Sequence, residues 1–161
     1  MSDGTLDLDQ VQRLYELHGR ALLAYACAFL RDPSDAEDVV HQVFLRLLRG
    51  GATVTITSAG YLFHAVRNGA LNHIRGRSRE VELNGEAQWL ESPSGSRETA
   101  LALQSALRAL PEEQREVIVL RVWGQLTFEE IGGVVDISPN TAASRYRYGL
   151  AKLKEIWHGR T

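Results

Sequence analysis

One stretch of this chain, Thr127 to Leu153, constrains the fold more than any other; it reads TFEEIGGVVDISPNTAASRYRYGLAKL. A first helix is predicted from Thr127, its N-cap, to Val135, and two glutamates in its first turn suit the positive end of the helix dipole. After a tight corner, Ser138 caps a second helix with Pro139 at its first position, where a missing N–H costs nothing. This pattern favours a helix-turn-helix, whose second helix enters the DNA major groove. An ordinary helical hairpin within a bundle is the alternative.

The second of these helices has an apolar side and a polar side. Apolar residues recur at three- and four-residue steps, as expected for a helix face that packs on a core. They are Ala142, Tyr146, Leu150, Leu153 and Trp157. The polar side carries Asn140, Thr141, Ser144, Arg147 and Tyr148. Within this helix no acid precedes Glu155, so the polar side is suited to binding a polyanion.

The net charge of the chain is −2 over 161 residues, and this does not exclude nucleic acid as a partner. The distribution of charge matters more than its sum. Segments 59–79 and 138–154 each contain basic residues and no acid, whereas the acids collect at 32–38 and 80–98. Two basic segments on a neutral-to-acidic body predict two contacts with nucleic acid.

Other chemistry is not indicated by the sequence. The single cysteine, Cys27, excludes an internal disulfide and fits a reducing cytosol. We expect a cytoplasmic protein, because there is no export signal and no apolar run long enough to span a membrane. The histidines do not fall at metal-ligand spacing, and no catalytic or phosphate-binding motif occurs. The sequence therefore predicts a binding protein with no metal, no cofactor and no enzymatic activity.

Helical periodicity predicts an all-α fold made of two small domains. The N-terminal domain, residues 8–79, is expected to be a three-helix bundle. Its second helix should begin with a capping box in which Ser34 pairs with Glu37. The C-terminal domain, residues 97–158, is expected to contain four helices, the last two being the helix-turn-helix.

The segment between these domains, residues 80–96, is rich in Gly, Pro, Ser and acids and predicts a flexible linker. Trp89 and Leu90 form a small apolar island within it. This island is either a docking patch for a partner or a piece that folds back on one of the domains.

Two blocks of the chain resemble the sigma-70 family of bacterial RNA polymerase promoter-recognition subunits, in its small extracytoplasmic-function (ECF) type. The first block is DAEDVVHQVFLRLL (35–48) followed by YLFHAVRNGALNHIRGRSR (61–79). The second is LPEEQREVIVLRVWGQLTFEEIGGVVDISPNTAASRYRYGLAKL (110–153). A single helix-turn-helix is weak evidence, but both blocks in this order and at this separation make the resemblance specific.

The resemblance implies a promoter-specificity factor that acts with core RNA polymerase. The N-terminal domain would bind the polymerase and the minus-10 element, and the C-terminal domain would bind the minus-35 element. The partners implied are the β′ clamp helices and the β flap of the polymerase, promoter DNA, and an anti-sigma factor as a regulator. The residues implied for the β′ contact are Asp35, Glu37, Asp38, Gln42 and Arg46.

The same resemblance implies which residues contact DNA. Those on the helix that captures the opened minus-10 strand are Tyr61, His64, Arg67, Asn68, Asn72, Arg75, Arg77 and Arg79. The loop at 50–58 is expected to form a pocket for a flipped base. Those on the helix that reads the minus-35 element are Ser138, Asn140, Thr141, Ala143, Ser144, Arg145 and Arg147.

The chain also departs from the family pattern at several positions. Ala143 stands where a basic residue is common, and Asp136 stands where the turn usually has Gly. Asn72 replaces a common Asp, and Tyr61 replaces a common Trp. Two other functions remain open at this point, a free-standing helix-turn-helix regulator and a sigma-like adaptor that binds an anti-sigma protein.

Overall fold

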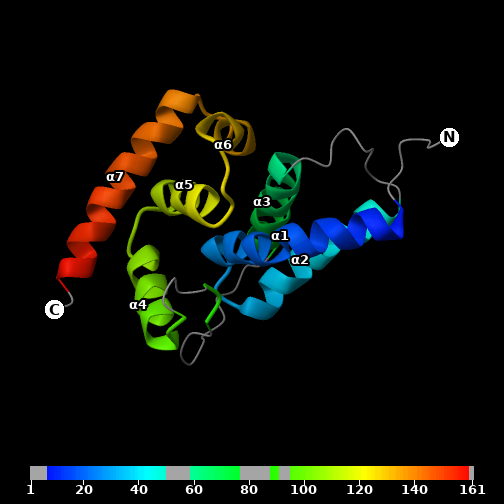
Figure 1. The fold of residues 1–161 in the computed structure, drawn as a ribbon, viewed down its shortest axis with the longest axis horizontal. Helices are drawn as coiled ribbons and strands as arrows, with labels where there is room; N and C mark the ends of the chain where they lie inside the picture. The colour runs from blue at the N-terminus through cyan, green and yellow to red at the C-terminus, as the bar shows by residue number, and fades with distance from the viewer. Residues whose placement is uncertain (1–6, 50–58, 77–87, 91–94, 160–161) are drawn as a thin grey trace.

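The computed structural model describes residues 7–49, 59–76, 88–90 and 95–159. Every regular element in these ranges is an α-helix, as the sequence predicts (Figure 1). In chain order they are α1 (Leu8–Phe29), α2 (Pro33–Leu48), α3 (Ala59–Gly76), α4 (Arg97–Arg108), α5 (Glu112–Val122), α6 (Phe128–Val135) and α7 (Pro139–His158). The predicted pocket loop at 50–58 lies outside the described residues.

Helices α1, α2 and α3 pack against one another as the predicted N-terminal bundle. The predicted capping box at Ser34 is wrong: α2 is capped by Asp32, whose side chain accepts a hydrogen bond from the backbone N–H of Ser34 at 2.9 Å. Pro33 occupies the first helical position, where its ring fixes a helical φ and no N–H is needed. The helix therefore begins before the residue that the capping-box pattern selects.

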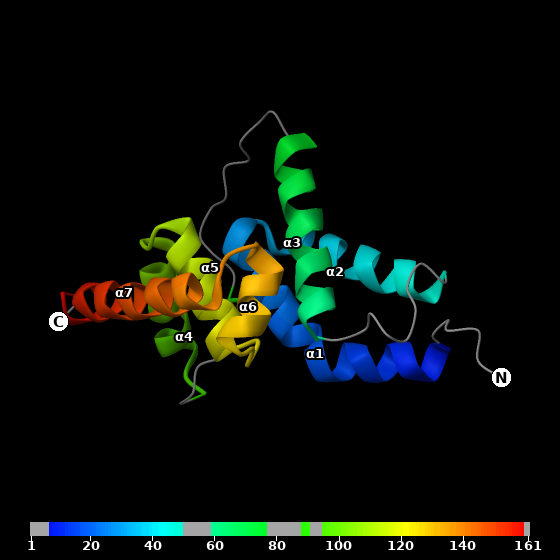
Figure 2. The same ribbon diagram turned by 90° about the horizontal axis from the view of Figure 1, so that it is seen from above.

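The two halves of the chain pack directly on each other, in addition to being joined by the linker (Figure 2). Helix α5 lies against α1, and α6 lies against α3. One continuous apolar core includes residues from both halves. Helix α5 is buried on all sides over residues 116–120, as expected for a central helix. The domain limits at 8–79 and 97–158 stay a prediction, and most of the linker lies outside the described residues.

The apolar island of the linker folds back on the C-terminal half. Gln104 of α4 is fully buried, and its side-chain oxygen accepts hydrogen bonds from the backbone N–H groups of Trp89 (2.5 Å) and Leu90 (3.0 Å). The guanidinium of Arg108 lies 5.3 Å from the centroid of the Trp89 ring. The island therefore packs on α4 and forms part of the core.

The helix-turn-helix has the caps that the sequence predicts. Thr127 and Glu130 form a capping box at the start of α6, with distances of 3.1 and 2.8 Å between their side-chain oxygens and the reciprocal backbone nitrogens. Asp136 ends α6 in the left-handed conformation, with φ 62° and ψ 52°. Ser138 caps α7 by accepting from the backbone N–H of Thr141 at 3.1 Å. An aspartate thus adopts the backbone conformation for which the family commonly uses glycine.

The predicted apolar stripe of α7 is partly wrong. Leu150 and Trp157 are each 37% exposed. The side that meets the core carries Ala142, Tyr146, Gly149, Leu153 and Ile156. Gly149 explains the difference: a Cβ there would lie 2.8 Å from Cδ1 of Ile118, so the bare backbone lets α7 approach α5. Counting large apolar side chains along the sequence cannot detect such a contact.

Two adjacent glycines of α6 should respond in opposite ways to alanine. A Cβ at Gly132 would lie 2.5 Å from the carbonyl oxygen of Ile137 in the turn, whereas a Cβ at Gly133 meets nothing within 4 Å. We expect Gly132→Ala to lower the free energy of unfolding by about 1–3 kcal/mol, because the turn must shift. Gly133→Ala should raise it by up to about 1 kcal/mol through helix propensity. Thermal unfolding of both variants measures this, and equal shifts would contradict the turn geometry.

Candidate nucleic-acid interface

The residues predicted to contact DNA form two exposed polar surfaces, and the first is at the N-terminus of α7. Ser138, Asn140 and Thr141 are exposed there. The Ser138 hydroxyl accepts from the backbone of Thr141 and donates to its hydroxyl at 3.0 Å, so these two side chains also stabilise the start of the helix. Asn140 is the exposed amide of this first turn. The surface is thus preformed and carries no acid in the first turn of α7.

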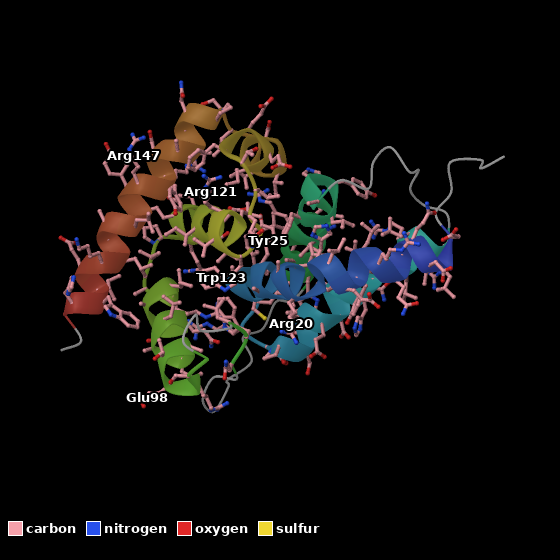
Figure 3. The ribbon with its side chains drawn as sticks, in the orientation of Figure 1. Arg20, Tyr25, Glu98, Arg121, Trp123 and Arg147 are labelled. Atoms are coloured by element: carbon pink, nitrogen blue, oxygen red, sulfur yellow. The ribbon has the colours of Figure 1, made fainter. Side chains whose placement is uncertain are left out.

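The other residues predicted to contact the minus-35 element follow along α7. Arg147 is exposed and lies on the side of α7 turned away from the other helices (Figure 3). Its guanidinium donates to the hydroxyl of Ser144 at 3.4 Å. Ala143, Ser144 and Arg145 are half-buried. An open groove between α7 and the start of α5 is lined by Glu113, Gln114, Asn140, Thr141, Ser144, Arg145 and Tyr148.

Helix α5 packs against both helices of the helix-turn-helix. Arg121 donates to the carbonyl of Leu126 at 2.9 Å, and its guanidinium lies 4.6 Å from the ring centroid of Phe128. The Phe128 ring in turn contacts Tyr146 of α7, with centroids 5.6 Å apart. These contacts connect α5, α6 and α7, so the orientation of α7 is set by the buried helix α5 on which it packs.

Helix α3 provides a second exposed polar surface. Four residues at three- and four-residue steps lie exposed along it: His64, Asn68, Asn72 and Arg75. The Asn68 amide nitrogen and His64 Nδ1 are 3.4 Å apart, and Arg75 donates to the Asn72 amide oxygen at 2.8 Å. We call these four residues the α3 stripe. Arg77 and Arg79, predicted to continue it, lie outside the described residues.

Two predicted DNA residues of α3 are turned from this stripe. Tyr61 is half-buried and packs against the core. Arg67 is half-buried and reaches the C-terminal half, where its Nε lies 2.5 Å from Oε1 of Glu116 on α5. The structure therefore brings four of the predicted strand-binding residues together and separates Arg67 from them.

Arg67 belongs to a buried cluster with Glu116 and Tyr25. The Tyr25 hydroxyl donates to the same Glu116 oxygen at 2.5 Å, and Tyr25 and Glu116 are 0% and 4% exposed. Figure 3 places Tyr25 where α1 meets the C-terminal half. Burial, together with the negative charge and hydrogen bond of Glu116, raises the pKa of Tyr25 well above its usual value. Burial opposes the charged form of Arg67, but Glu116 outweighs it and raises the pKa of this guanidinium.

The neighbouring residue, Arg115, makes a second connection between the halves. Its guanidinium donates to the carbonyl of Ala28 near the end of α1 at 2.8 Å. It also donates to carbonyls at the end of α4, those of Leu107, Arg108 and Leu110. One side chain thus donates to carbonyl groups at two helix ends, where the last carbonyls of a helix commonly need partners from outside it. Burial, with a smaller repulsion from Arg108, lowers the pKa of Arg115.

The residues predicted to bind polymerase lie along α2. Glu37, Asp38, Gln42 and Arg46 are exposed. Asp35 is set apart: its side chain is 15% exposed and lies 3.3 Å from His73 of α3. Four of the five predicted residues therefore share an open surface, and Asp35 connects α2 to α3.

The sequence analysis did not identify Glu116 or Arg115 as important residues. Glu116 directly precedes the apolar run of the sequence REVIVL, and it is one of two polar residues among the buried side chains described. A charge at the edge of an apolar helical run was the available signal. It is weak, because the sequence does not show which side of α5 would be covered by the other half.

The described residues contain no group of His, Cys, Asp and Glu that could hold a metal ion. None of the described helices is long and apolar enough to cross a membrane.

Comparison with known proteins places both halves of the chain in one family. Residues 14–80 match the family model for sigma-70 region 2, and residues 100–153 match the one for sigma-70 region 4. The chain is 31% identical over 141 residues to an RNA polymerase sigma-E factor of Streptomyces avermitilis, covering 84% of this chain and 78% of that protein. It is 21% identical over 160 residues to the ECF RNA polymerase sigma factor SigM of Bacillus subtilis, covering 92% and 95%.

The chain belongs to the sigma-70 family, in its ECF type. Its relatives are transcription initiation factors without enzymatic activity, and the predictions of a sigma factor and of no enzyme are confirmed. The fold is also similar to that of the sigma factor RpoE of Bartonella quintana, solved with the anti-sigma factor NepR. The TM-score is 0.77 at 22% identity, covering 94% of this chain and 98% of that one.

The buried tyrosine of this sigma factor should make its stability sensitive to alkali. Because the pKa of Tyr25 is raised in the folded state, the unfolded chain loses this proton first as the pH rises. Stability due to Tyr25 is therefore complete below about pH 10, the usual tyrosine pKa, and is lost as pH rises above it. We expect Tyr25→Phe to flatten this decline in the free energy of unfolding, measured by urea titration at several pH values.

Tyr148→Phe is the matched control, since Tyr148 is 67% exposed. It should keep the pH dependence of the wild type. A Tyr25→Phe variant with an unchanged alkaline decline would contradict the assignment.

Proposed function

We propose that this sigma factor binds core RNA polymerase, reads the minus-35 and minus-10 elements of its promoters, and promotes opening of the DNA. The observation that carries the proposal is the presence of two exposed polar-basic surfaces on one small fold, the N-terminal part of α7 and the α3 stripe. A free-standing helix-turn-helix regulator needs only the first of them.

The α7 surface is suited to base reading in the major groove. Asn140 has the donor and acceptor pair that reads adenine, and the fork of Arg147 reads guanine; each such contact is worth about 1–3 kcal/mol of discrimination. The helix N-terminus, which lacks acids in its first turn, favours a phosphate close to Ser138 and Thr141. Ser144 and Arg145 border the same groove.

The α3 stripe is suited to single-stranded DNA. Binding an opened strand requires cations for phosphates and flat groups for unstacked bases. Arg75 supplies a cation, and His64, Asn68 and Asn72 supply planar groups that also form hydrogen bonds. Because no nucleotide-hydrolysis motif occurs in the sequence, the free energy of opening would come from binding.

The exposed surface of α2 is suited to the β′ clamp helices of the polymerase. Glu37, Asp38, Gln42 and Arg46 lie beside two large exposed apolar residues, Leu45 (39%) and Leu48 (43%). Apolar residues within a polar rim are typical of protein interfaces, in which the rim charges chiefly steer association. The C-terminal half would contact the β flap. An anti-sigma factor is a further candidate partner, because the similar RpoE structure is a complex with one.

Run-off transcription with purified core RNA polymerase on a promoter library tests this function. We expect promoter-specific transcripts only when the chain and core enzyme are both present, and weak binding of the chain alone to duplex DNA. Arg147→Ala should reduce transcription from the selected promoters about 5- to 150-fold and relax the preference at one minus-35 position, because a base contact of about 1–3 kcal/mol is lost.

Lys154→Ala is the matched control for this substitution. It removes one positive charge from an exposed position of the same helix, far along α7 from its N-terminus. It should leave the sequence preference unchanged. Tight operator binding by the chain alone, without core enzyme, would instead support a free-standing regulator and overturn the proposal.

A further inference from the structure

The inner surfaces of the two halves form an extensive contact. Helix α5 packs on α1, and α6, the first helix of the helix-turn-helix, packs on α3 (Figures 1 and 2). The close approach continues at Gly124, where a Cβ would lie 3.2 Å from the ring of Phe63 on α3. The structure therefore describes a closed arrangement, in which both predicted DNA surfaces belong to one packed body.

This closed arrangement does not fit two distant promoter elements at once. Elements centred at minus-35 and minus-10 are separated by about 25 base pairs, which is about 85 Å of B-form DNA. Helices α3 and α7 are each roughly 30 Å long or less, and α6 packs against both of them. Their two surfaces are therefore too close together to occupy both elements. A chain that reads both elements has to separate its halves.

The buried cluster of Tyr25, Glu116 and Arg67 provides the polar contact that separation would break. Glu116 comes from the C-terminal half, and its two partners come from the N-terminal half. A carboxylate that is 4% exposed needs such partners, because an unpaired buried charge is strongly unfavourable. The cluster also engages Arg67, a residue that the family resemblance assigns to the DNA track.

We propose that this cluster holds the free sigma factor in a closed, self-inhibited state, and that core polymerase binds the open state, in which Arg67 leaves Glu116 for the DNA backbone. The inhibitory part of this proposal rests on the proposed function. The chain between Gly76 and Trp89 reaches roughly 45 Å when extended, so the halves can part while Trp89 stays bound to Gln104 on α4.

Removing the charge of Glu116 tests the cluster. Glu116→Gln keeps the shape of the side chain but leaves the Arg67 guanidinium, whose side chain is 26% exposed, without a counter-ion. Arg67 regains full hydration when the halves separate. We expect the radius of gyration of the free chain, measured by small-angle X-ray scattering, to rise by about 3 Å or more, since an open two-domain chain is less compact than one domain.

Two further variants complete the scattering experiment. Glu98→Gln makes the same chemical change at an exposed position in the first turn of α4 and should keep the wild-type radius. Tyr25→Phe removes the other polar partner of Glu116 from the opposite half and should expand the chain in the same direction. Circular dichroism distinguishes opening from unfolding, because opening keeps the helical signal of the wild type.

Binding to core polymerase tests the inhibitory role. When only a minor fraction of the wild-type chain is open, the apparent affinity of that chain for core polymerase is reduced in proportion to this fraction. Glu116→Gln should therefore bind core enzyme about tenfold tighter than either the wild type or Glu98→Gln. Arg67 is kept in all these variants, so the DNA track remains intact.

The two readouts separate this inference from the proposed function. A Glu116→Gln chain that keeps both its helical signal and the wild-type radius, together with an unchanged Tyr25→Phe chain, overturns the role of the cluster whatever the protein does at promoters. Expansion with unchanged affinity for core enzyme overturns self-inhibition but keeps the proposed function. Expansion with no binding of core enzyme by any variant overturns the proposed function itself.

Discussion

The burial of one carboxylate, that of Glu116, determines how the halves of this protein meet. Apolar burial supplies most of the attraction between α5 and the N-terminal bundle, but it is not directional. A buried carboxylate, in contrast, requires donors at defined positions, and these come from Tyr25 and Arg67. Arg115 adds a second directional contact through the carbonyl of Ala28. These contacts orient α5, the central helix of the C-terminal half, relative to α1 and α3.

Helix α5 combines two roles that are usually separate. Its buried side packs on the N-terminal bundle. Its other contacts position α6 and α7: Arg121 donates to the carbonyl of Leu126 just before α6, and Ile118 lies against Gly149 of α7. A change at the contact between the halves therefore acts on the same helix that supports the surface proposed to read DNA. This arrangement gives a physical route from the state of the contact to the orientation and availability of α7, without any intervening ligand.

Much of the helical architecture follows from local sequence. Thr127 and Ser138 cap their helices as predicted, because a side-chain oxygen next to a free backbone N–H is a local interaction. The errors have local causes as well. Asp32 caps α2 in place of Ser34, because the helix already begins at Pro33, two residues before the start that a Ser34 cap would give. The α7 stripe differs because Gly149, with no side chain to count, lies against Ile118 of α5.

The candidate site, too, combines features that follow from local sequence with contacts that only the tertiary structure shows. Sequence alone determined the helix types, the helix-turn-helix and the exposed polar residues of α3 and α7, since helical periodicity and capping depend on residues three or four positions apart. It also carried the motifs that identify the family. Only the tertiary structure decided that Arg67 faces Glu116, that Asp35 meets His73, and that the two halves share one core. These contacts join residues distant in the chain, so no local pattern specifies them.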